Sequence, residues 1–212
     1  MDDHRAISQA AAVLADPTRL EILLVLMDGR SYPATDLAAR VHVSNSTASH
    51  HLGLLVEAGF VQVICQGRHR YHRLAGHEVA DVVESLGAVA KPPQKVVTPL
   101  SAGRSCYNHL AGEIGVQVRQ SLESRGFIGS ASGIYEVLPI GKDLFESLGL
   151  DVGLTGKVCL DWTERVPHVG GALGRALFSA LIEKGWICRG DVPRQIQLVQ
   201  KDCFNAAFPH SL

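Results

Sequence analysis

The sequence predicts a mainly helical chain with small β-hairpins, an α+β fold in two differently built parts. In the first 90 residues, apolar side chains recur at helical spacing and then alternate over one short stretch. The segment 91–95, two prolines and a glutamine between lysines, has the composition of a linker. The remainder matches itself at an offset of 59 residues, which brings His109 onto His168. We therefore predict a first domain at 1–90, a linker at 91–98 and a duplicated domain at 99–212.

Composition excludes several classes of protein. With 212 residues, 46% of them hydrophobic and 19% charged, the chain can bury a substantial core. It has no apolar run of the roughly 18 residues that a membrane span needs, and Met1 to Arg5 do not resemble an export signal. We expect a cytoplasmic protein without a membrane partner. Five cysteines, an odd number at irregular spacing, favour free thiols over a disulfide framework.

Five helices and one hairpin are expected in the first domain. Asp16 is placed to cap a helix that begins at Pro17, and Ser44 to cap a later one that ends before Gly59. Beyond Gly59 the apolar period changes from helical to alternating, with a turn at Gly67-Arg68. The expected helices run from Ala6 to Leu14, from Pro17 to the break at Asp28-Gly29, from Ala34 to Val41, from Asn45 to Ala58 and from His77 to Ala90.

This order, a short helix, a tight break, a helix with a polar outer face and a hairpin with a basic tip, is that of a winged helix-turn-helix. The net charge is only −1, but residues 61–77 carry three arginines and no acidic residue. Short polar side chains suit base edges in the major groove, and hairpin arginines suit phosphates. We predict DNA contacts by Ser44, Asn45, Ser46, Thr47, Ser49, His50, His51, Arg68, His69 and Arg70.

Four motifs in one order resemble the ArsR/SmtB family of bacterial repressors across roughly residues 6–90. They are the stretches 14–23 (LADPTRLEIL), 44–52 (SNSTASHHL), 55–61 (LVEAGFV) and 67–74 (GRHRYHRL). The resemblance implies a homodimer built from the first and last helices of the domain. It further implies binding to an inverted-repeat DNA operator, and release when a metal, a metalloid, a thiol oxidant or an organic effector acts.

The chain departs from the family's better-known metal sites. Residues 31–35 (SYPAT) contain no Cys-x-Cys pair, so the arsenite-type thiolate site is missing. The closing helix has carboxylates but lacks the Asp-x-His and His pairing of the zinc-type dimer site; its candidate residues are His77, Glu78, Asp81 and Glu84. Metal sensing by the DNA-binding half is therefore not expected.

The duplicated part is predicted to hold two winged-helix-like units, at about 104–149 and 163–208. Each copy is interpreted as a helix rich in small residues, a glycine-aromatic-isoleucine break, a hairpin and a short final helix. Glycines three apart, such as Gly112 and Gly115, permit close helix packing, or frame a pocket between the copies. Neither copy has a basic surface like that of the first domain, so a second DNA-binding unit is not expected.

Effector candidates gather where the two copies begin. Cys106 and His109 are three apart, a spacing that we interpret as one helix face, and Cys159, Trp162 and His168 open the second copy. If the copies pack face to face, Cys106, His109, Cys159 and His168 converge into a metal-binding set or a reactive thiol centre. The alternative is two buried cysteines and two hydrogen-bonded histidines. Cys65, Cys188 and Cys203 are interpreted as core, and the fold requires no cofactor.

The sequence thus favours a non-enzymatic DNA-binding regulator, a repressor released from its operator by an effector sensed in the C-terminal half. A second hypothesis is a DNA-bound module whose repeats bind another protein and no small molecule. A third is a thiol-dependent enzyme that uses Cys106 or Cys159 with a histidine base. No local sequence signature supports the enzyme.

Overall fold

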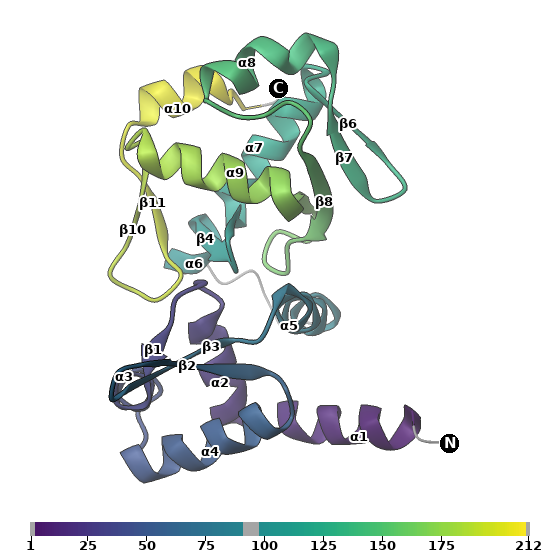
Figure 1. Cartoon of the computed structure of the whole chain (residues 1–212). Coiled ribbons are helices and arrows are strands. Elements are labelled where there is room, and N and C mark those ends of the chain that lie inside the picture. Colours follow the sequence, from purple (N-terminus) through teal and green to yellow (C-terminus); the bar gives the residue numbers. More distant parts are fainter. Residues whose placement is uncertain (1–2, 91–97, 211–212) are drawn as a thin grey trace. The chain divides into compact units, whose positions relative to one another are not determined.

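The computed structural model describes residues 3–90 and 98–210 and divides the chain into two compact units, Met1–Val83 and Glu84–Leu212 (Figure 1). The predicted linker lies outside the described residues except for Thr98. That threonine caps a short helix by accepting a hydrogen bond from the Ser101 N–H. Among the described residues, none of the helices combines the length and the apolar character needed to cross a bilayer.

The first unit follows the predicted order of elements, with one addition. Its elements are α1 (Asp3–Leu14), α2 (Pro17–Leu26), β1 (Tyr32–Pro33), α3 (Ala34–Arg40), α4 (Asn45–Glu57), β2 (Val61–Gln66), β3 (His69–Leu74) and α5 (His77–Val89). The addition is β1, which pairs with β3 through Tyr32 and His72. Two residues are too short to display the alternation that predicts a strand.

Capping and burial explain these elements. Asp16 accepts the Arg19 N–H at 2.9 Å at the start of α2, as predicted, and Pro17 occupies the first helical turn. The helices then bury apolar side chains against one another, which removes that surface from water. The buried side chains of this core include Ile22, Leu23, Leu26, Leu37, Leu52 and Leu55.

The second unit contains two copies of one ββαββα arrangement. The first copy comprises α6 (Pro99–Ala102), β4 (Arg104–Cys106), β5 (His109–Ala111), α7 (Gly112–Ser124), β6 (Ile128–Ala131), β7 (Ile134–Val137), η1 (Pro139–Gly141) and α8 (Lys142–Ser147). The second comprises β8 (Thr155–Leu160), β9 (Pro167–Gly170), α9 (Gly171–Glu183), β10 (Ile187–Arg189), β11 (Ile196–Leu198) and α10 (Lys201–Ala207). The sequence does not predict the opening hairpin of either copy; β4 and β5, with three residues each, are too short to show a period.

The join between helix and second hairpin is the same in both copies and in the first unit. After α7 the Phe127 N–H donates to the Leu122 carbonyl at 2.8 Å, and after α9 the Trp186 N–H donates to the Leu181 carbonyl at 3.0 Å. Phe60 N–H makes the matching bond after α4 at 2.9 Å. A glycine with positive φ precedes each aromatic residue, which is the left-handed helix end that glycine favours.

The two copies exchange hairpin partners. The four-stranded sheet β6-β7-β8-β9 joins the second hairpin of the first copy to the opening hairpin of the second. Conversely, the second hairpin of the second copy meets β4, where Ser105 N–H donates to the Arg194 carbonyl at 2.8 Å and Ile196 N–H to the Gly103 carbonyl at 2.9 Å. Each copy therefore completes the β-structure of the other.

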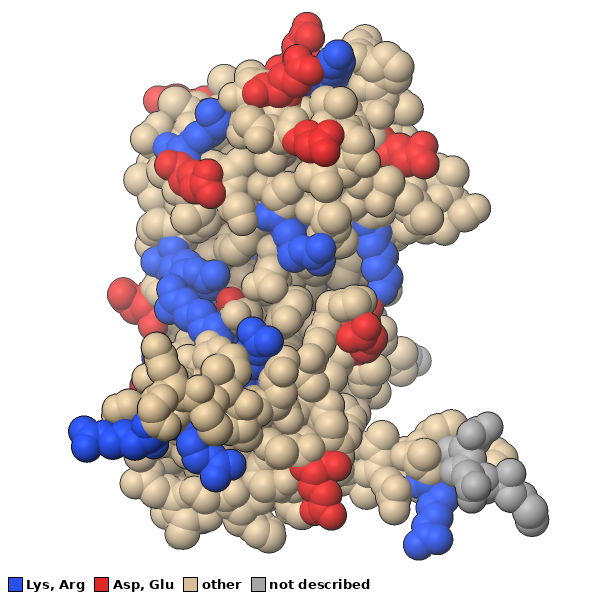
Figure 2. All heavy atoms as spheres, viewed as in Figure 1, with Lys and Arg blue, Asp and Glu red and all other residues tan. Residues whose placement is uncertain are grey.

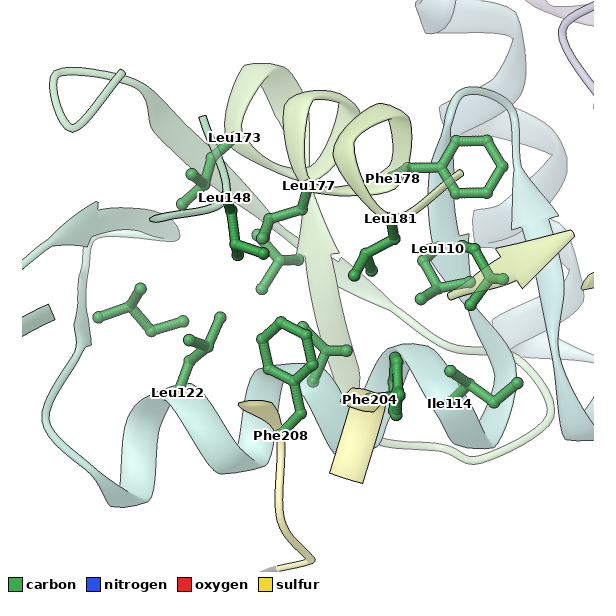
Figure 3. Packing of buried hydrophobic residues seen from close by; sticks show 14 of the residues in the cluster. Leu110, Ile114, Leu122, Leu148, Leu173, Leu177, Phe178, Leu181, Phe204 and Phe208 are labelled. Carbon is green, nitrogen blue, oxygen red and sulfur yellow. The ribbon is translucent and has the colours of Figure 1, made fainter. Parts of the chain in front are cut away.

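Helices α7 and α9 contribute corresponding residues to the core of the second unit (Figure 3). Ile114 and Leu122 of α7 correspond, at the repeat offset, to Leu173 and Leu181 of α9, and all four are buried. Their spacing of eight residues keeps each pair on one helix face. The duplicated sequence is thus a duplicated core, which fixes where the opening hairpins lie.

Candidate functional site

The outer face of α4 is polar and exposed, as the sequence predicts for a recognition helix. Ser44 caps the helix by accepting the Thr47 N–H at 3.1 Å. Ala48, Leu52 and Leu55 are buried beneath it. The side chains left exposed on the other face are Asn45, Ser46, Ser49 and His50, with Thr47 half-buried.

The neighbouring histidine lies differently from His50. The His51 side chain is only 13% exposed, and its Nδ1 lies 3.7 Å from the Asp16 carboxylate at the start of α2. The His51 ring therefore lies against the start of α2, and of this histidine pair His50 is the one whose side chain is exposed.

The β2–β3 hairpin presents the basic tip that the sequence predicts. Gln66 pairs with His69 across a two-residue turn at Gly67-Arg68, and Arg68, His69 and Arg70 are all exposed. Figure 2 shows basic side chains projecting from this face of the first unit. The prediction that Cys65 belongs to the core is wrong, because strand β2 extends beyond the helices and leaves this thiol exposed.

Cys203 and Cys188 also differ from the prediction. Cys203 is exposed on α10 and Cys188 is half-buried on β10. Phe204 of α10 and Phe208, which directly follows the helix, are both buried, and Cys203 lies outside the face that they define.

The four predicted cysteine and histidine candidates converge in the second unit. Cys106, His109, Cys159 and His168 each offer a ligand atom, and these atoms all lie within 4.8 Å of one another. The two Nε2 atoms of the histidines are 3.1 Å apart. Cys106, His109 and His168 are buried and Cys159 is half-buried. Trp162 lies outside this cluster, with its ring against the Arg104 guanidinium.

The cluster lies on strands, which corrects the predicted helix face. Cys106 on β4 is directly opposite His109 on β5, and Cys159 on β8 is directly opposite His168 on β9. A spacing of three also occurs across a two-residue hairpin turn, and Tyr107 has the positive φ, 57°, that such a turn requires. The loop between β8 and β9 is longer, so Cys159 and His168 are farther apart along the chain than Cys106 and His109. The two residues of each pair are nevertheless directly opposite each other across their strands.

Helix glycines make room for the histidines reciprocally. A Cβ on Gly174 of α9 would lie 3.2 Å from the Cβ of His109, and one on Gly115 of α7 would lie 3.7 Å from the Cβ of His168. Each helix of one copy therefore packs beside the histidine of the other. The glycines three apart serve the packing that the sequence predicted for them, and they also border the cluster.

Asp161 is a functional candidate that sequence reasoning missed. Its Oδ2 lies 3.1 Å from His168 Nδ1 and accepts the Gly112 N–H at 2.7 Å. Its Oδ1 accepts from Arg104 Nη2 at 2.9 Å. Asp161 and Arg104 are both fully buried. The position of Asp161 two residues after Cys159 was the only local signal, because a buried aspartate is not distinguishable from a surface one by type.

A second buried acid continues this network. Glu84, the first residue of the second unit, accepts from Arg194 Nη2 at 2.8 Å and lies 3.8 Å from Arg104 Nη2. Arg194 also donates from Nε to the Ser105 carbonyl at 3.0 Å. Two buried guanidinium groups are thus compensated by two buried carboxylates, as burial of charge requires.

The cluster separates charge between its members. Burial alone would lower the pKa of His168, but hydrogen bonding to Asp161 and Cys159 raises it to about 9. Burial lowers the pKa of His109 and raises that of the Cys106 thiol. Hydrogen bonding from Cys106, and then from the two histidines, lowers the pKa of Cys159.

Taken together, a helix-turn-helix with a polar recognition face and a basic wing defines the class of DNA-binding transcriptional regulators. The model of the arsR family of bacterial regulatory proteins matches residues 16–63. A relative from Bacillus subtilis, an uncharacterized HTH-type transcriptional regulator named YdfF, is 39% identical over 209 residues and covers 92% of each chain. The chain belongs to the arsR family.

Other relatives match shorter stretches of the chain. The regulator CmtR of Mycobacterium bovis is 37% identical over 81 residues, 38% of this chain and 68% of its own. The arsenical resistance operon repressor of Staphylococcus xylosus is 30% identical over 110 residues, 52% of this chain and 97% of its own. A solved winged helix-turn-helix domain from M. bovis, a possible ArsR-family regulator, is 26% identical with a TM-score of 0.40 and covers 44% of this chain and 87% of its own.

Proposed function

We propose that this protein is a homodimeric repressor that leaves an inverted-repeat operator when an effector acts on its C-terminal half. The observation that carries the proposal is the pairing of a DNA-binding unit with a buried Cys/His cluster built jointly by the two copies. Repression is supported by the name of the staphylococcal relative, an operon repressor.

Dimerisation is supported by apolar side chains exposed on the first and last helices of the DNA-binding region. Ile7 of α1 is 66% exposed, and Val82 and Leu86 of α5 are 43% and 47% exposed. Apolar surface of this kind on two helices is typical of a subunit interface. Light scattering at micromolar concentration is expected to give a dimer, and Leu86→Glu to give a monomer with much weaker operator binding.

The DNA-reading role is tested on α4. An operator is first selected from random duplexes with the full-length protein. Ser46→Ala, Ser49→Ala and His50→Ala are each expected to cost about 1–3 kcal/mol at the contacted base pair, because each removes one base contact. Gln120→Ala, an exposed substitution on α7, is the control. Unchanged base preference in all three α4 variants would remove that helix from the reading role.

The alternative in which the repeats dock another protein predicts a different result. Operator affinity would then be insensitive to metal ions and to thiol reagents. A cluster with an effector role instead makes operator affinity depend on one of these reagents, and Cys159→Ser would abolish that dependence while Cys203→Ser, at an exposed cysteine, would not.

A further inference from the structure

We propose that Cys106, His109, Cys159 and His168 form a four-coordinate site for Zn²⁺ or a cation of the same preference, with Asp161 as the residue that positions His168. The inference deepens the proposed function by naming the class of effector. Two thiolates and two imidazoles are the donor set of closed tetrahedral zinc sites. The chain supplies all four from one compact unit.

Distances within the cluster fit a tetrahedron. With metal bonds of about 2.0–2.1 Å to nitrogen and 2.3 Å to sulfur, neighbouring ligand atoms lie about 3.3–3.8 Å apart. The histidine Nε2 atoms are 3.1 Å apart, and every pair among the four ligand atoms lies within 4.8 Å. Side-chain movements of about 1 Å or less therefore complete the coordination shell.

Asp161 supplies what a metal-bound histidine needs from its surroundings. Its carboxylate faces Nδ1 of His168, so the proton stays on Nδ1 and the Nε2 lone pair is directed at the cluster. Arg104 and the Gly112 N–H fix the carboxylate in turn. This carboxylate–histidine arrangement is the usual outer shell of zinc ligands.

The closed donor set also favours sensing over catalysis. Four protein ligands leave no position for a substrate or a water, which a catalytic zinc requires. A Cβ at Gly170 would lie 3.3 Å from His109 Nε2 and 3.2 Å from Cys159 Cβ, so the backbone itself closes this side of the cluster. The ligands come from the opening hairpins of both copies, and a bound ion would therefore join the copies.

The experiment uses the full-length protein, reduced and freed of metal with a chelator. Co²⁺ is titrated first, followed by Zn²⁺ in competition with a chromophoric chelator. We expect one equivalent of Co²⁺ per chain, with the intense ligand-field absorption of a tetrahedral site and a thiolate-to-cobalt charge-transfer band. Cys159→Ser and His168→Gln should each lower Zn²⁺ affinity by at least about 100-fold, while Cys188→Ser, a half-buried cysteine outside the cluster, should leave it unchanged.

Asp161→Asn is expected to keep the tetrahedral cobalt spectrum and to weaken Zn²⁺ binding by about 10–100-fold, as loss of an outer-shell partner does. Circular dichroism checks that each variant is folded. A cobalt spectrum without thiolate bands, or equal losses in Cys188→Ser, would overturn the proposal. So would oxidation of the metal-free protein to a Cys106–Cys159 disulfide combined with Zn²⁺ binding too weak to compete with the chelator.

Metal binding is measured without DNA, so the two proposals fail separately. A tight Co²⁺ and Zn²⁺ site combined with operator affinity that does not change with the metal would leave the metal site standing and refute the metal ion as the effector. If the protein bound neither Co²⁺ nor Zn²⁺ but peroxide changed its operator affinity, the inference would be refuted and the proposed function would stand.

Discussion

Gly115 and Gly174 set the distance between each histidine of the cluster and the helix of the other copy. A Cβ at Gly174 would lie 2.2 Å from the Val169 carbonyl oxygen. This oxygen belongs to the backbone, so no side-chain rotation can relieve the clash. Gly53 in α4 is also a helix glycine, but a Cβ there meets nothing within 4 Å. The same residue type therefore has opposite roles at these two positions.

Gly174→Ala is expected to destabilise the second unit by about 1–3 kcal/mol, because overpacking forces the hairpin away from α9. Gly53→Ala should instead raise stability by about 0.5–1 kcal/mol, the helix preference for alanine over glycine. Urea unfolding followed by circular dichroism measures both. Equal effects of the two substitutions would contradict the packing role of Gly174.

At the residue scale, the sequence predicts the ligands better than their surroundings. The histidines were identified because the repeat pairs His109 with His168, and the cysteines because they lie near them. Asp161 and Arg104 escaped notice because burial of a charge is a property of the fold, and the sequence around them is not distinctive.

Among the elements, the β2–β3 hairpin is the one for which we predict contact with DNA phosphates from its charge. Its tip carries Arg68 and Arg70, both exposed, and phosphate contacts by arginine release counterions from DNA. Such contacts add affinity for every sequence and carry no base preference.

Arg68→Ala and Arg70→Ala are expected to weaken binding to all duplexes and to reduce the slope of log affinity against log salt by about 0.9 each. Fluorescence anisotropy over a series of salt concentrations measures the slope. Arg175→Ala, at an exposed arginine on α9, serves as the control and should leave the slope unchanged. A weaker variant with the original slope would count against phosphate contact.

Helix boundaries in the first unit agree with the sequence expectation closely, since caps at Asp16 and Ser44 and long periodic faces define them. In the second unit the sequence predicts the hairpin after each long helix but not the opening hairpin of either copy. Strands of three residues show no period, and the separation of Cys106 from His109 fits a helical turn and a tight hairpin equally well.

On the scale of the whole molecule, Glu84 is the residue at which the second unit begins along the chain. α5 starts in the first unit, and from Glu84 onward its residues belong to the second. Glu84 is bonded to Arg194 and lies near Arg104, which in turn holds Asp161 beside His168. A change at the cluster has a continuous set of buried charges through which to act on α5.

Saturation with Zn²⁺ is therefore expected to change operator affinity by about 5–150-fold, the usual range of coupling between two sites. Glu84→Gln should reduce that change while the tetrahedral cobalt spectrum is retained, because the substitution leaves all four ligands in place. Glu113→Gln, at an exposed position on α7, is the matched control. Full coupling in Glu84→Gln would show that the signal takes another route.

The duplication was visible in the sequence, but the pairing between copies was not. Periodicity and self-similarity identify β7 as a strand at most and do not identify β8, and the partner of each depends on which copy lies nearer after folding. Ile134 pairs with Lys157 and Tyr135 with Gly156. These residue types do not indicate which strand will be the partner.

The exchange of hairpins has a consequence for folding and for dissection of the chain. A fragment that ended after α8 would expose the edge of β7, which pairs with β8 in the intact chain, and would retain only one cysteine–histidine pair. Neither copy is therefore a separable module, and opening of one removes strand partners from the other. Slow amide hydrogen exchange would report this as a single cooperative event, in which the amides of β4, β7, β8 and β11 lose protection together.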